Sequence, residues 1–443
     1  MQVNEIAGKI KAAGVVGSGG AGFPTHVKFA SKAEIFLVNG AECEPMLKVD
    51  QQLMAKYPRE LIRGIELGMT ATGAREGVIC LKAKYKAAIA ALEPLLPSSM
   101  RIHILKDVYP AGDEVITIWM ATGRRVPPGA IPISIGVVVN NPLTLINVAR
   151  AVDQDMPVIT RTLTVSGAVR KPLTVTVPIG TSMAEVLAMA GGVTIDNPAY
   201  LDGGPMMGKL VNDINQPVTK TTGGLLVFPA DHILIRRRTT SMEQIRRVAE
   251  TNCVQCNLCT ELCPRHMIGH ELPPHLLVRS SNFNDVGTPL VRLAALTCSE
   301  CAICEAYACP VDISPMRLNI AYKAELRAEG ARYVGDLRPL DVLAEDRLIP
   351  SIRLVHRNAI TRYVQDAPLI EDGWLPEKVS LPLRQHIGAA ATPVVREGDY
   401  VHRGQLIAQM EEGALGASIH ASMDGEVSTV TAQSITISGK KAK

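Results

Sequence analysis

The chain has 443 residues, of which 47% are hydrophobic, and a formal net charge of +3. This length predicts about three domains, and the apolar content is sufficient to build their cores. A near-neutral charge without a long basic run argues against a nucleic-acid-binding protein. No apolar run approaches the ~20 residues that span a bilayer, and the first residues do not have the regions of a signal peptide. We therefore expect a cytoplasmic protein with no membrane and no nucleic-acid partner.

Residues 1–155 are predicted to form a Rossmann-like α/β domain that begins with a helix and a glycine-rich loop, Gly17–Thr25. Gly17, Gly19 and Gly22 fit the pattern G-x-G-x-x-G. A true dinucleotide fingerprint, however, follows a strand and opens a long helix. The loop therefore indicates backbone amides that a phosphate or a flat ring could approach closely. A mobile glycine turn is the alternative interpretation.

Further along this domain, helices alternate with short buried strands. Pro58 opens an amphipathic helix, and a second helix, Lys84–Leu96, lies between the predicted strands Val78–Leu81 and Ile102–Leu105. Such alternation is typical of a largely parallel sheet. Glycines, amides and carboxylates gather in three loops of the kind that bind a polar cofactor, namely Asn39–Pro45, Gly112–Glu114 and Val139–Thr144.

Residues 156–230 have the pattern of a small β domain. Val158–Val165 is a predicted strand, Ser182 begins a helix with a capping box, and Gly223–Pro229 is predicted to close the sheet. Strands around one helix suggest a β-grasp domain, which we interpret as a structural spacer between its neighbours. The segment Gly203–Gly208 is predicted to be a contact loop without an assigned partner.

Residues 231–345 contain eight of the ten cysteines of the chain, in two runs within a predicted helical domain. The first run has the spacing C-x2-C-x2-C-x3-C-P of bacterial ferredoxins and comprises Cys253, Cys256, Cys259 and Cys263. The second run has one extra residue before its last cysteine and comprises Cys298, Cys301, Cys304 and Cys309. A zinc site would need only two C-x2-C pairs, and disulfides suit small secreted domains.

Two 4Fe–4S clusters explain the repeated third cysteine. In the ferredoxin arrangement, the fourth cysteine of each run ligates the other cluster. We therefore assign one cluster to Cys253, Cys256, Cys259 and Cys309. The second cluster is assigned to Cys298, Cys301, Cys304 and Cys263.

Residues 346–443 are predicted to form a connector and a barrel-sandwich hybrid, because short strands alternate with Gly-Asp and Gly turns. The pattern resembles biotinyl and lipoyl domains, which carry a cofactor on a hairpin lysine. No lysine occurs between Lys378 and Lys440. This domain is therefore expected to be a docking or structural module.

The loop motifs of the first domain resemble the flavin-binding subunit of respiratory complex I and, more closely, the C subunit of the Rnf electron-transport complex. The resemblance implies non-covalent FMN with NADH stacked on it. Carried over by motif, the residues that would hold FMN are Gly17, Gly19, Gly20, Gly22, Lys28, Asn39, Gly112, Asn140, Asn141 and Thr144. Those near the nicotinamide would be Phe23, Glu42, Glu44 and Glu114, with Glu44 and Glu114 as candidate catalytic residues. Complex I has an aspartate in place of Ala41, which changes the details of the contacts.

The whole length resembles the cobalamin reductases of bacterial propanediol-utilisation microcompartments, since the barrel follows the clusters here and precedes the flavin domain in the Rnf C subunit. This resemblance implies that electrons pass singly from NADH, through FMN and two 4Fe–4S clusters, to the cobalt of cobalamin. It also implies a cob(I)alamin adenosyltransferase and shell proteins as partners, inside a microcompartment. The sequence has no corrinoid motif. Two alternatives are a peripheral subunit of an Rnf-type membrane complex and a non-enzymatic, ferredoxin-like electron wire.

Overall fold

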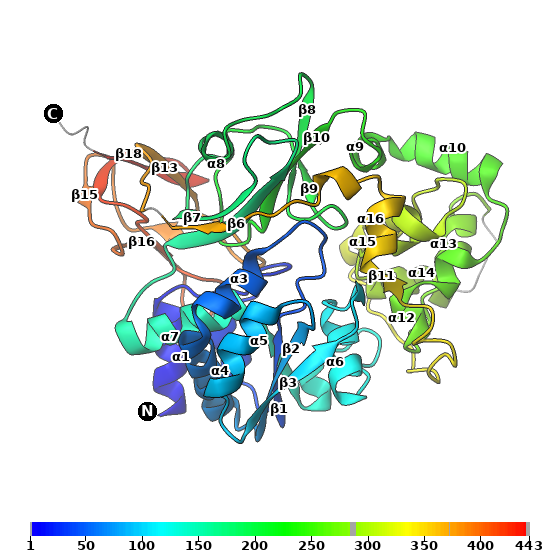
Figure 1. Ribbon diagram of the computed structural model, residues 1–443, viewed down its shortest axis with the longest axis horizontal. Helices are drawn as coiled ribbons and strands as arrows, with labels where there is room; N and C mark the ends of the chain where they lie inside the picture. Colours follow the sequence, from blue (N-terminus) through cyan, green and yellow to red (C-terminus); the bar gives the residue numbers. More distant parts are fainter. Residues whose placement is uncertain (1, 284–288, 372, 440–443) are drawn as a thin grey trace.

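The computed structural model describes residues 2–283, 289–371 and 373–439. Figure 1 shows four packed units: the N-terminal α/β domain below, the β-grasp domain above it, the cysteine-rich helical domain on the right and the barrel on the left. No helix within the described ranges is both long and apolar enough to cross a membrane.

The N-terminal domain is built on a four-stranded parallel sheet of order β3-β2-β1-β5, as the alternating pattern predicts. Its strands are β1 (Ile35–Asn39), β2 (Glu76–Lys82), β3 (Met100–Leu105) and β5 (Val137–Asn140). Five longer helices, and Phe29 of the short helix α2 (Thr25–Phe29), share a core with one face of the sheet; the five are α1 (Val3–Ala12), α3 (Val49–Lys56), α4 (Pro58–Thr72), α5 (Lys86–Leu92) and α7 (Pro142–Gln154). On the other face packs α6 (Glu114–Thr122), and β4 (Val108–Tyr109) is a short strand.

Burial on both faces explains why these strands are almost continuously apolar. Phe36 of β1 points toward α4 and its neighbour Leu37 toward α6, and both are fully buried. Gly68 of α4 leaves room for the Phe36 ring, because a Cβ there would lie 2.2 Å from a ring carbon. The helix α1 also belongs to this core, where Ile6 and Ile10 are fully buried.

The β-grasp domain has a mixed sheet of order β12-β7-β6-β10-β8-β9 around one helix, in which β12 (Leu369–Ile370) comes from the later connector. The elements are β6 (Thr160–Gly167), β7 (Leu173–Pro178), α8 (Met183–Met189), β8 (Pro198–Asp202), β9 (Lys209–Val211) and β10 (Gly224–Pro229). The closing strand β10 pairs in parallel with the first strand, β6. The predicted capping box is confirmed, with the hydroxyl of Ser182 accepting from the backbone amide of Glu185.

The cysteine-rich domain is helical, as predicted. Its α-helices are α9 (Ile233–Thr239), α10 (Met242–Asn252), α11 (Leu258–Glu261), α12 (Pro264–Met267), α13 (Pro274–Ser280), α14 (Pro289–Ala294) and α15 (Pro315–Ala328). The extra residue of the second cysteine run lies in a π-helical turn, Cys304–Ala308. A π-turn holds one more residue than an α-turn, so the additional position does not displace Cys309 from the cysteines it faces.

The connector lies against two other domains before the barrel begins. Its strand β11 (Ile349–Pro350) pairs with β4, the helix α16 (Ser351–Arg357) follows, and β12 (Leu369–Ile370) joins the β-grasp sheet beside β7. The barrel consists of β13 (Lys378–Pro382), β14 (Thr392–Pro393), β15 (Tyr400–Val401), β16 (Leu406–Gln409), β17 (Ile419–His420), β18 (Gly425–Val430) and β19 (Ser434–Ser438). These strands form two sheets around one apolar core.

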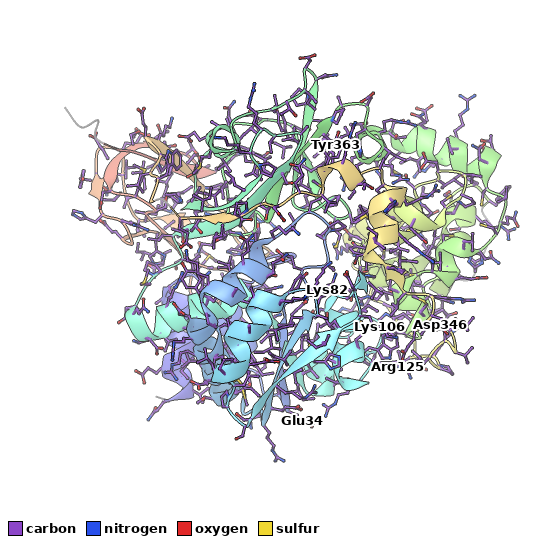
Figure 2. The ribbon with its side chains drawn as sticks, viewed as in Figure 1. Glu34, Lys82, Lys106, Arg125, Asp346 and Tyr363 are labelled. Carbon is purple, nitrogen blue, oxygen red and sulfur yellow. The ribbon has the colours of Figure 1, made fainter. Side chains whose placement is uncertain are left out.

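Charged side chains line the border between the N-terminal and cysteine-rich domains (Figure 2). Arg125 donates to the carbonyls of Ile268 and Arg338, at 3.1 and 2.7 Å. Lys106 pairs with Glu345 at 2.6 Å. The two domains therefore meet through specific polar contacts as well as through the apolar cluster around α6.

Candidate functional site

The strand order places a topological switch point between β1 and β5. The chain passes from β1 to β2 and β3 on one side, and β5 lies on the other side of β1. In open parallel sheets, ligands bind outside the carboxyl ends of the strands at such a point. The last residues of these two strands are Asn39 and Asn140, both predicted cofactor residues.

Hydrogen bonds join the predicted residues around this edge. The amide of Asn39 donates to the carbonyl of Gly112 at 2.8 Å, and that of Asn141 reaches the carbonyl of Asn39 at 3.4 Å. Lys28 donates to the carbonyl of Val139 at 2.8 Å and lies 3.3 Å from the Glu114 carboxylate. Three loops that are distant in sequence thus surround the ends of β1 and β5.

The glycine loop lies against the same edge. The backbone amide of Ser18 donates to the Thr144 hydroxyl at 2.9 Å, and a Cβ at Gly19 would lie 3.0 Å from the side-chain oxygen of Asn141. Gly20 and Gly22 have φ of +60° and +68°, which favour glycine. Gly17 donates to the carbonyl of Phe23 at 2.9 Å and closes the loop. These contacts favour a held loop over a mobile glycine turn.

Two other domains also hold this loop. Buried Arg161, on β6, donates to the carbonyl of Ser18 at 2.8 Å and to those of Lys220 and Thr222. Burial lowers the pKa of Arg161 to about 10. On the barrel side, the amide of Ile387 donates to the carbonyl of Ala21 at 2.8 Å. The β-grasp domain therefore helps to hold the glycine loop in place. From the sequence, only a spacer role was predicted for this domain.

The residues at this edge fit a flavin nucleotide. The side-chain nitrogen of Asn140 is buried, and no acceptor among the described residues reaches it. Buried polar groups normally have partners, so an unpaired donor at a switch point suggests a bound acceptor. Gly19 and Gly20 are exposed beside it and offer backbone amides, and Lys28 supplies positive charge. The ring carbonyls and phosphate of FMN would match these donors.

Two predicted acidic residues point elsewhere. Glu42 accepts from the backbone amides of Asp50 and Gln51, at 2.9 and 3.3 Å, and so caps α3. Burial raises the pKa of Glu42 and also that of Asp50 beside it. Glu44 accepts from the amides of Met206 and Met207, at 2.9 and 2.7 Å. The assignment of Glu42 and Glu44 to the nicotinamide stays a prediction, and each has a structural role here.

The contact loop Gly203–Gly208 now has its partners. On one side the loop binds Glu44, whose pKa is raised to about 7 by burial. On the other, Arg238 of α9 donates to the carbonyls of Pro205, Met206 and Gly208, at 2.8–3.1 Å. The loop therefore joins the N-terminal domain to the start of the cysteine-rich domain.

The eight cysteines of the two runs line two separate cavities. One cavity is lined by Cys253, Cys256, Cys259 and Cys309. The other is lined by Cys263, Cys298, Cys301 and Cys304. Each cavity thus combines three cysteines of one run with the last of the other run, which is the grouping that ferredoxin spacing implies. Among the described residues, no three His, Cys, Asp or Glu side chains are grouped to hold a single metal ion.

The second cavity lies next to the switch-point edge. The buried hydroxyl of Tyr109 donates to the carbonyl of Cys301 at 2.9 Å. Arg265, two residues after Cys263, pairs at 3.0 Å with Asp113, the N-cap of α6. Cys43, whose Sγ would lie 3.0 Å from a Cβ at Gly112, packs in the same apolar cluster as Tyr109 and Cys301. The edge and this cavity therefore share a wall.

Four family models match the chain, in the order of the domains described above. They are the Nuo51 FMN-binding domain over residues 10–150, the SLBB domain over 162–210, the 4Fe-4S dicluster domain over 252–314 and the RnfC barrel sandwich hybrid domain over 355–442. The chain therefore carries an FMN-binding domain and a 4Fe–4S dicluster domain, as predicted.

Two relatives match almost the whole chain. The cobalamin reductase PduS of Salmonella typhimurium is 60% identical, covering 99% of this chain and 97% of its own length. That of Citrobacter freundii is 60% identical over 98% and 96%. The chain belongs to this cobalamin reductase family. A more distant relative, the C subunit of the Na(+)-translocating ferredoxin:NAD(+) oxidoreductase complex of Acetobacterium woodii, is 35% identical over 60% of this chain and 59% of its own.

Like its family, this reductase is an oxidoreductase. Several residues that hold its site together could not be predicted from the sequence. Arg161, Tyr109 and Arg265 belong to no motif that we used, and Asp113 lies in the predicted Gly112–Glu114 loop but was given no role. Arg161 gave a local signal, as a lone charge in an alternating strand that proved to be buried on both faces. The other three make contacts between residues more than 150 positions apart, which no local pattern encodes.

Proposed function

We propose that this reductase takes electrons from NADH at the β1–β5 edge and delivers them one at a time to the cobalt of cobalamin. The observation that carries the proposal is the shared wall between that edge and the cavity of Cys301, formed by the Tyr109 and Arg265 contacts. The 60% identity to the two cobalamin reductases supports the choice of acceptor.

FMN, when bound, supplies the conversion between hydride and single-electron chemistry, and 4Fe–4S clusters carry one electron at a time. The protein's own part is binding and positioning. Asn140 and the glycine-loop amides would hold the flavin, with Arg161 fixing the loop from behind. Lys28 lies at the carboxyl edge, where its side chain would face the negative charge of a reduced flavin. The residues assigned from the sequence to the flavin and to the clusters remain predictions.

The overall stoichiometry follows from these parts. One NADH gives up a hydride, which carries two electrons and becomes a proton once both have been passed on. Two cob(III)alamin molecules each accept one electron to become cob(II)alamin. The products are therefore NAD⁺, one proton and two cob(II)alamin, and a further one-electron reduction of each would give the cob(I) form that adenosylation requires.

The test is anaerobic stopped-flow spectroscopy of the protein loaded with FMN and iron–sulfur clusters, mixed first with NADH and then with cob(III)alamin. We expect bleaching of flavin and cluster absorbance, followed by the cob(II)alamin spectrum. Lys28→Met should slow the NADH phase, by about tenfold for one lost charge–dipole contact. Lys32→Met, an exposed lysine four residues on, is the matched control and should be unchanged.

The same experiment separates the alternatives. Bleaching without corrinoid reduction would send the electrons to another acceptor, and co-purification with integral membrane subunits would then support an Rnf-type role. Intact clusters with no response to NADH would support the electron wire. The position of the barrel counts against the Rnf-type role, because the barrel lies at the opposite end of the chain from its place in the Rnf C subunit.

We also propose that the reductase works inside a bacterial microcompartment, beside a cob(I)alamin adenosyltransferase and shell proteins. The identity to the PduS reductases supports this setting. Affinity purification of the intact protein from cells that form microcompartments tests it, and recovery without shell proteins or adenosyltransferase would contradict it.

A further inference from the structure

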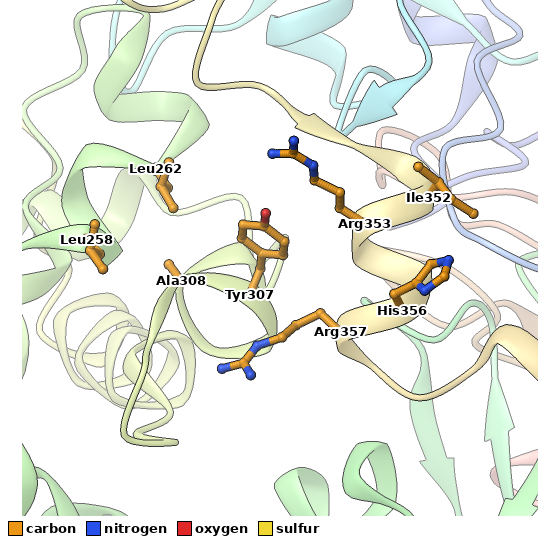
Figure 3. A pocket seen from close by; sticks show the side chains of 8 residues that line it. All are labelled: Leu258, Leu262, Tyr307, Ala308, Ile352, Arg353, His356 and Arg357. Atoms are coloured by element: carbon orange, nitrogen blue, oxygen red, sulfur yellow. The ribbon is translucent and has the colours of Figure 1, made fainter.

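An open groove of about 860 Å³ lies beside the two cysteine cavities (Figure 3). Its lining comes from α11, the π-helical turn and α16, and comprises Leu258, Leu262, Tyr307, Ala308, Ile352, Arg353, His356 and Arg357. Figure 3 shows Tyr307 in the middle, Leu258 and Leu262 across from α16, and the two guanidinium groups extending from α16 into the space between.

The groove lies close to both cavities along the chain and in space. Leu258 directly precedes Cys259, and Leu262 directly precedes Cys263, so the two residues flank ligand positions of different cavities. Ala308 directly precedes Cys309, and Arg357 donates to the carbonyl of Cys309 at 3.3 Å. A molecule in the groove would therefore sit beside either predicted cluster.

The wall formed by α16 is cationic and free of acidic partners. Ile352, Arg353, His356 and Arg357 are all exposed, on one face of the helix. Within the described part of the chain, neither arginine has a carboxylate within ion-pair distance, unlike Arg347 just before the helix. The helix packs inward through Leu354 and Val355, so its outer face does not serve the core.

Apolar side chains are exposed on both walls of the groove. Leu258 of the opposite wall is 37% exposed, and Ile352, beside the arginines on α16, is 60% exposed. Leu262 and Tyr307 are partly exposed. Apolar surface rimmed by arginines that have no carboxylate partner among the described residues marks a binding site for a ligand that has both a large apolar body and an anionic group.

We propose that this groove binds the corrinoid substrate, with Arg353 and Arg357 holding the phosphodiester of the nucleotide loop and Leu258, Ile352 and Tyr307 facing the macrocycle. The inference rests on the proposed function. In the step that it serves, one electron leaves the protein for cobalt(III), cobalt(II) forms, and the upper water ligand is released. No bond to the protein forms or breaks.

Equilibrium binding is the first test, because it does not depend on turnover. The protein with intact clusters is titrated with cyanocobalamin and with dicyanocobinamide, which has the macrocycle but no nucleotide loop. We expect cobalamin to bind more tightly, and Arg353→Gln to weaken cobalamin by about tenfold while leaving cobinamide unchanged. Equal losses for both ligands, or no loss, would overturn the assignment. The visible cluster absorbance checks that the variant is intact.

Arg246→Gln on α10 is the matched control, since Arg246 is exposed, lies in the same domain and does not line the groove. The charge reversal Arg353→Glu should weaken cobalamin further than Arg353→Gln does. If Arg353→Glu leaves cobalamin binding unchanged but slows electron transfer to an acidic ferredoxin, the groove belongs to a protein partner and the proposal fails.

Steady-state kinetics separate this inference from the proposed function. If wild-type protein reduces cob(III)alamin and Arg353→Gln raises KM for cobalamin with little change in kcat, both stand. Reduction of cob(III)alamin with an unchanged KM in the variant would refute the groove alone. Binding that depends on Arg353, in a wild-type protein that does not reduce the corrinoid, would refute the function and leave the site.

Discussion

The two cysteine cavities differ in their exposure. In the cavity next to the switch-point edge, Cys263, Cys301 and Cys304 are 7–8% exposed and Cys298 is partly exposed. In the other cavity, Cys256 is exposed and Cys253 and Cys259 are partly so, leaving Cys309 as its buried member. We call these the inner cavity and the outer cavity. The inner one contacts the N-terminal domain through Tyr109 and Asp113, whereas the outer one opens toward solvent.

Their polar surroundings differ as well. At the inner cavity, the sulfur of Cys298 accepts from the amide of Glu300 at 3.4 Å, and Lys323 donates to the Cys298 carbonyl at 2.8 Å. At the outer cavity, the sulfur of Cys309 accepts from the amide of Ile313 at 3.3 Å. Burial, charge and hydrogen bonds to sulfur set the potential of a 4Fe–4S cluster. From this comparison we expect the inner cluster to relay electrons and the outer cluster to deliver them at the surface.

The largest expected effect comes from removing one ligand of each cavity. Cys301→Ser should lose about half of the iron and leave the outer cluster reducible by dithionite but not by NADH. Cys256→Ser should leave an inner cluster that NADH still reduces. Iron analysis and electron paramagnetic resonance after each reductant measure this, with Cys80→Ala, a buried cysteine outside both runs, as control. Reduction of the outer cluster by NADH in Cys301→Ser would contradict electron transfer from the inner cluster to the outer one.

The contacts of the inner cavity with the N-terminal domain come next. Arg265→Met leaves Asp113 buried without its ion-pair partner, which typically costs about 3–5 kcal/mol. We expect faster release of iron from the inner cluster to a chelator, while the outer cluster is lost at the wild-type rate. Arg292→Met breaks an exposed pair with Glu325 and should have almost no effect. Equal acceleration at both clusters would mean that the cavities are not structurally independent.

A smaller effect is expected on potential. Lys323 is buried and lies between the Cys298 carbonyl and Glu300. Lys323→Met removes a positive charge that favours the reduced cluster, so the inner potential should fall by roughly 60 mV, a tenfold change in a one-electron equilibrium. Redox titration followed by electron paramagnetic resonance measures each cluster. A shift in the potential of the outer cluster instead would contradict the assignment of Lys323 to the inner cavity.

The smallest expected effect is a pH dependence. Glu44 holds the loop whose Met206 packs against Cys301, and burial raises its pKa from 4.5 to about 7. The folded state therefore binds this proton more firmly than the unfolded state does. The contribution of protonated Glu44 to the free energy of unfolding is present at low pH and is lost as pH rises toward and through about 7. Tm measured from pH 5 to pH 8 should fall less in Glu44→Gln than in wild type. A parallel pH profile in the variant would contradict this role.

The sequence predicted what is encoded locally. Cysteine spacing gave the grouping of both cavities, because the reach of a short loop is fixed by the number of residues between ligands. Motif similarity placed Asn39 and Asn140 at the cofactor, and the structure shows that both residues end parallel strands at one edge of the sheet. Motif similarity assigned Glu42 and Glu44 to the nicotinamide, but their present partners, Asp50 and Met206, depend on packing between segments that no motif describes.

The loop that opens the site is enclosed by residues from the far end of the chain. A Cβ at Gly22 would lie 2.6 Å from Thr221 and 2.9 Å from His386. During synthesis, the glycine loop is made first, Thr221 follows midway and His386 comes much later, so the neighbours of this loop are complete only after most of the polypeptide has been made. We therefore expect a chain that stops before the barrel to bind FMN more weakly than the full chain.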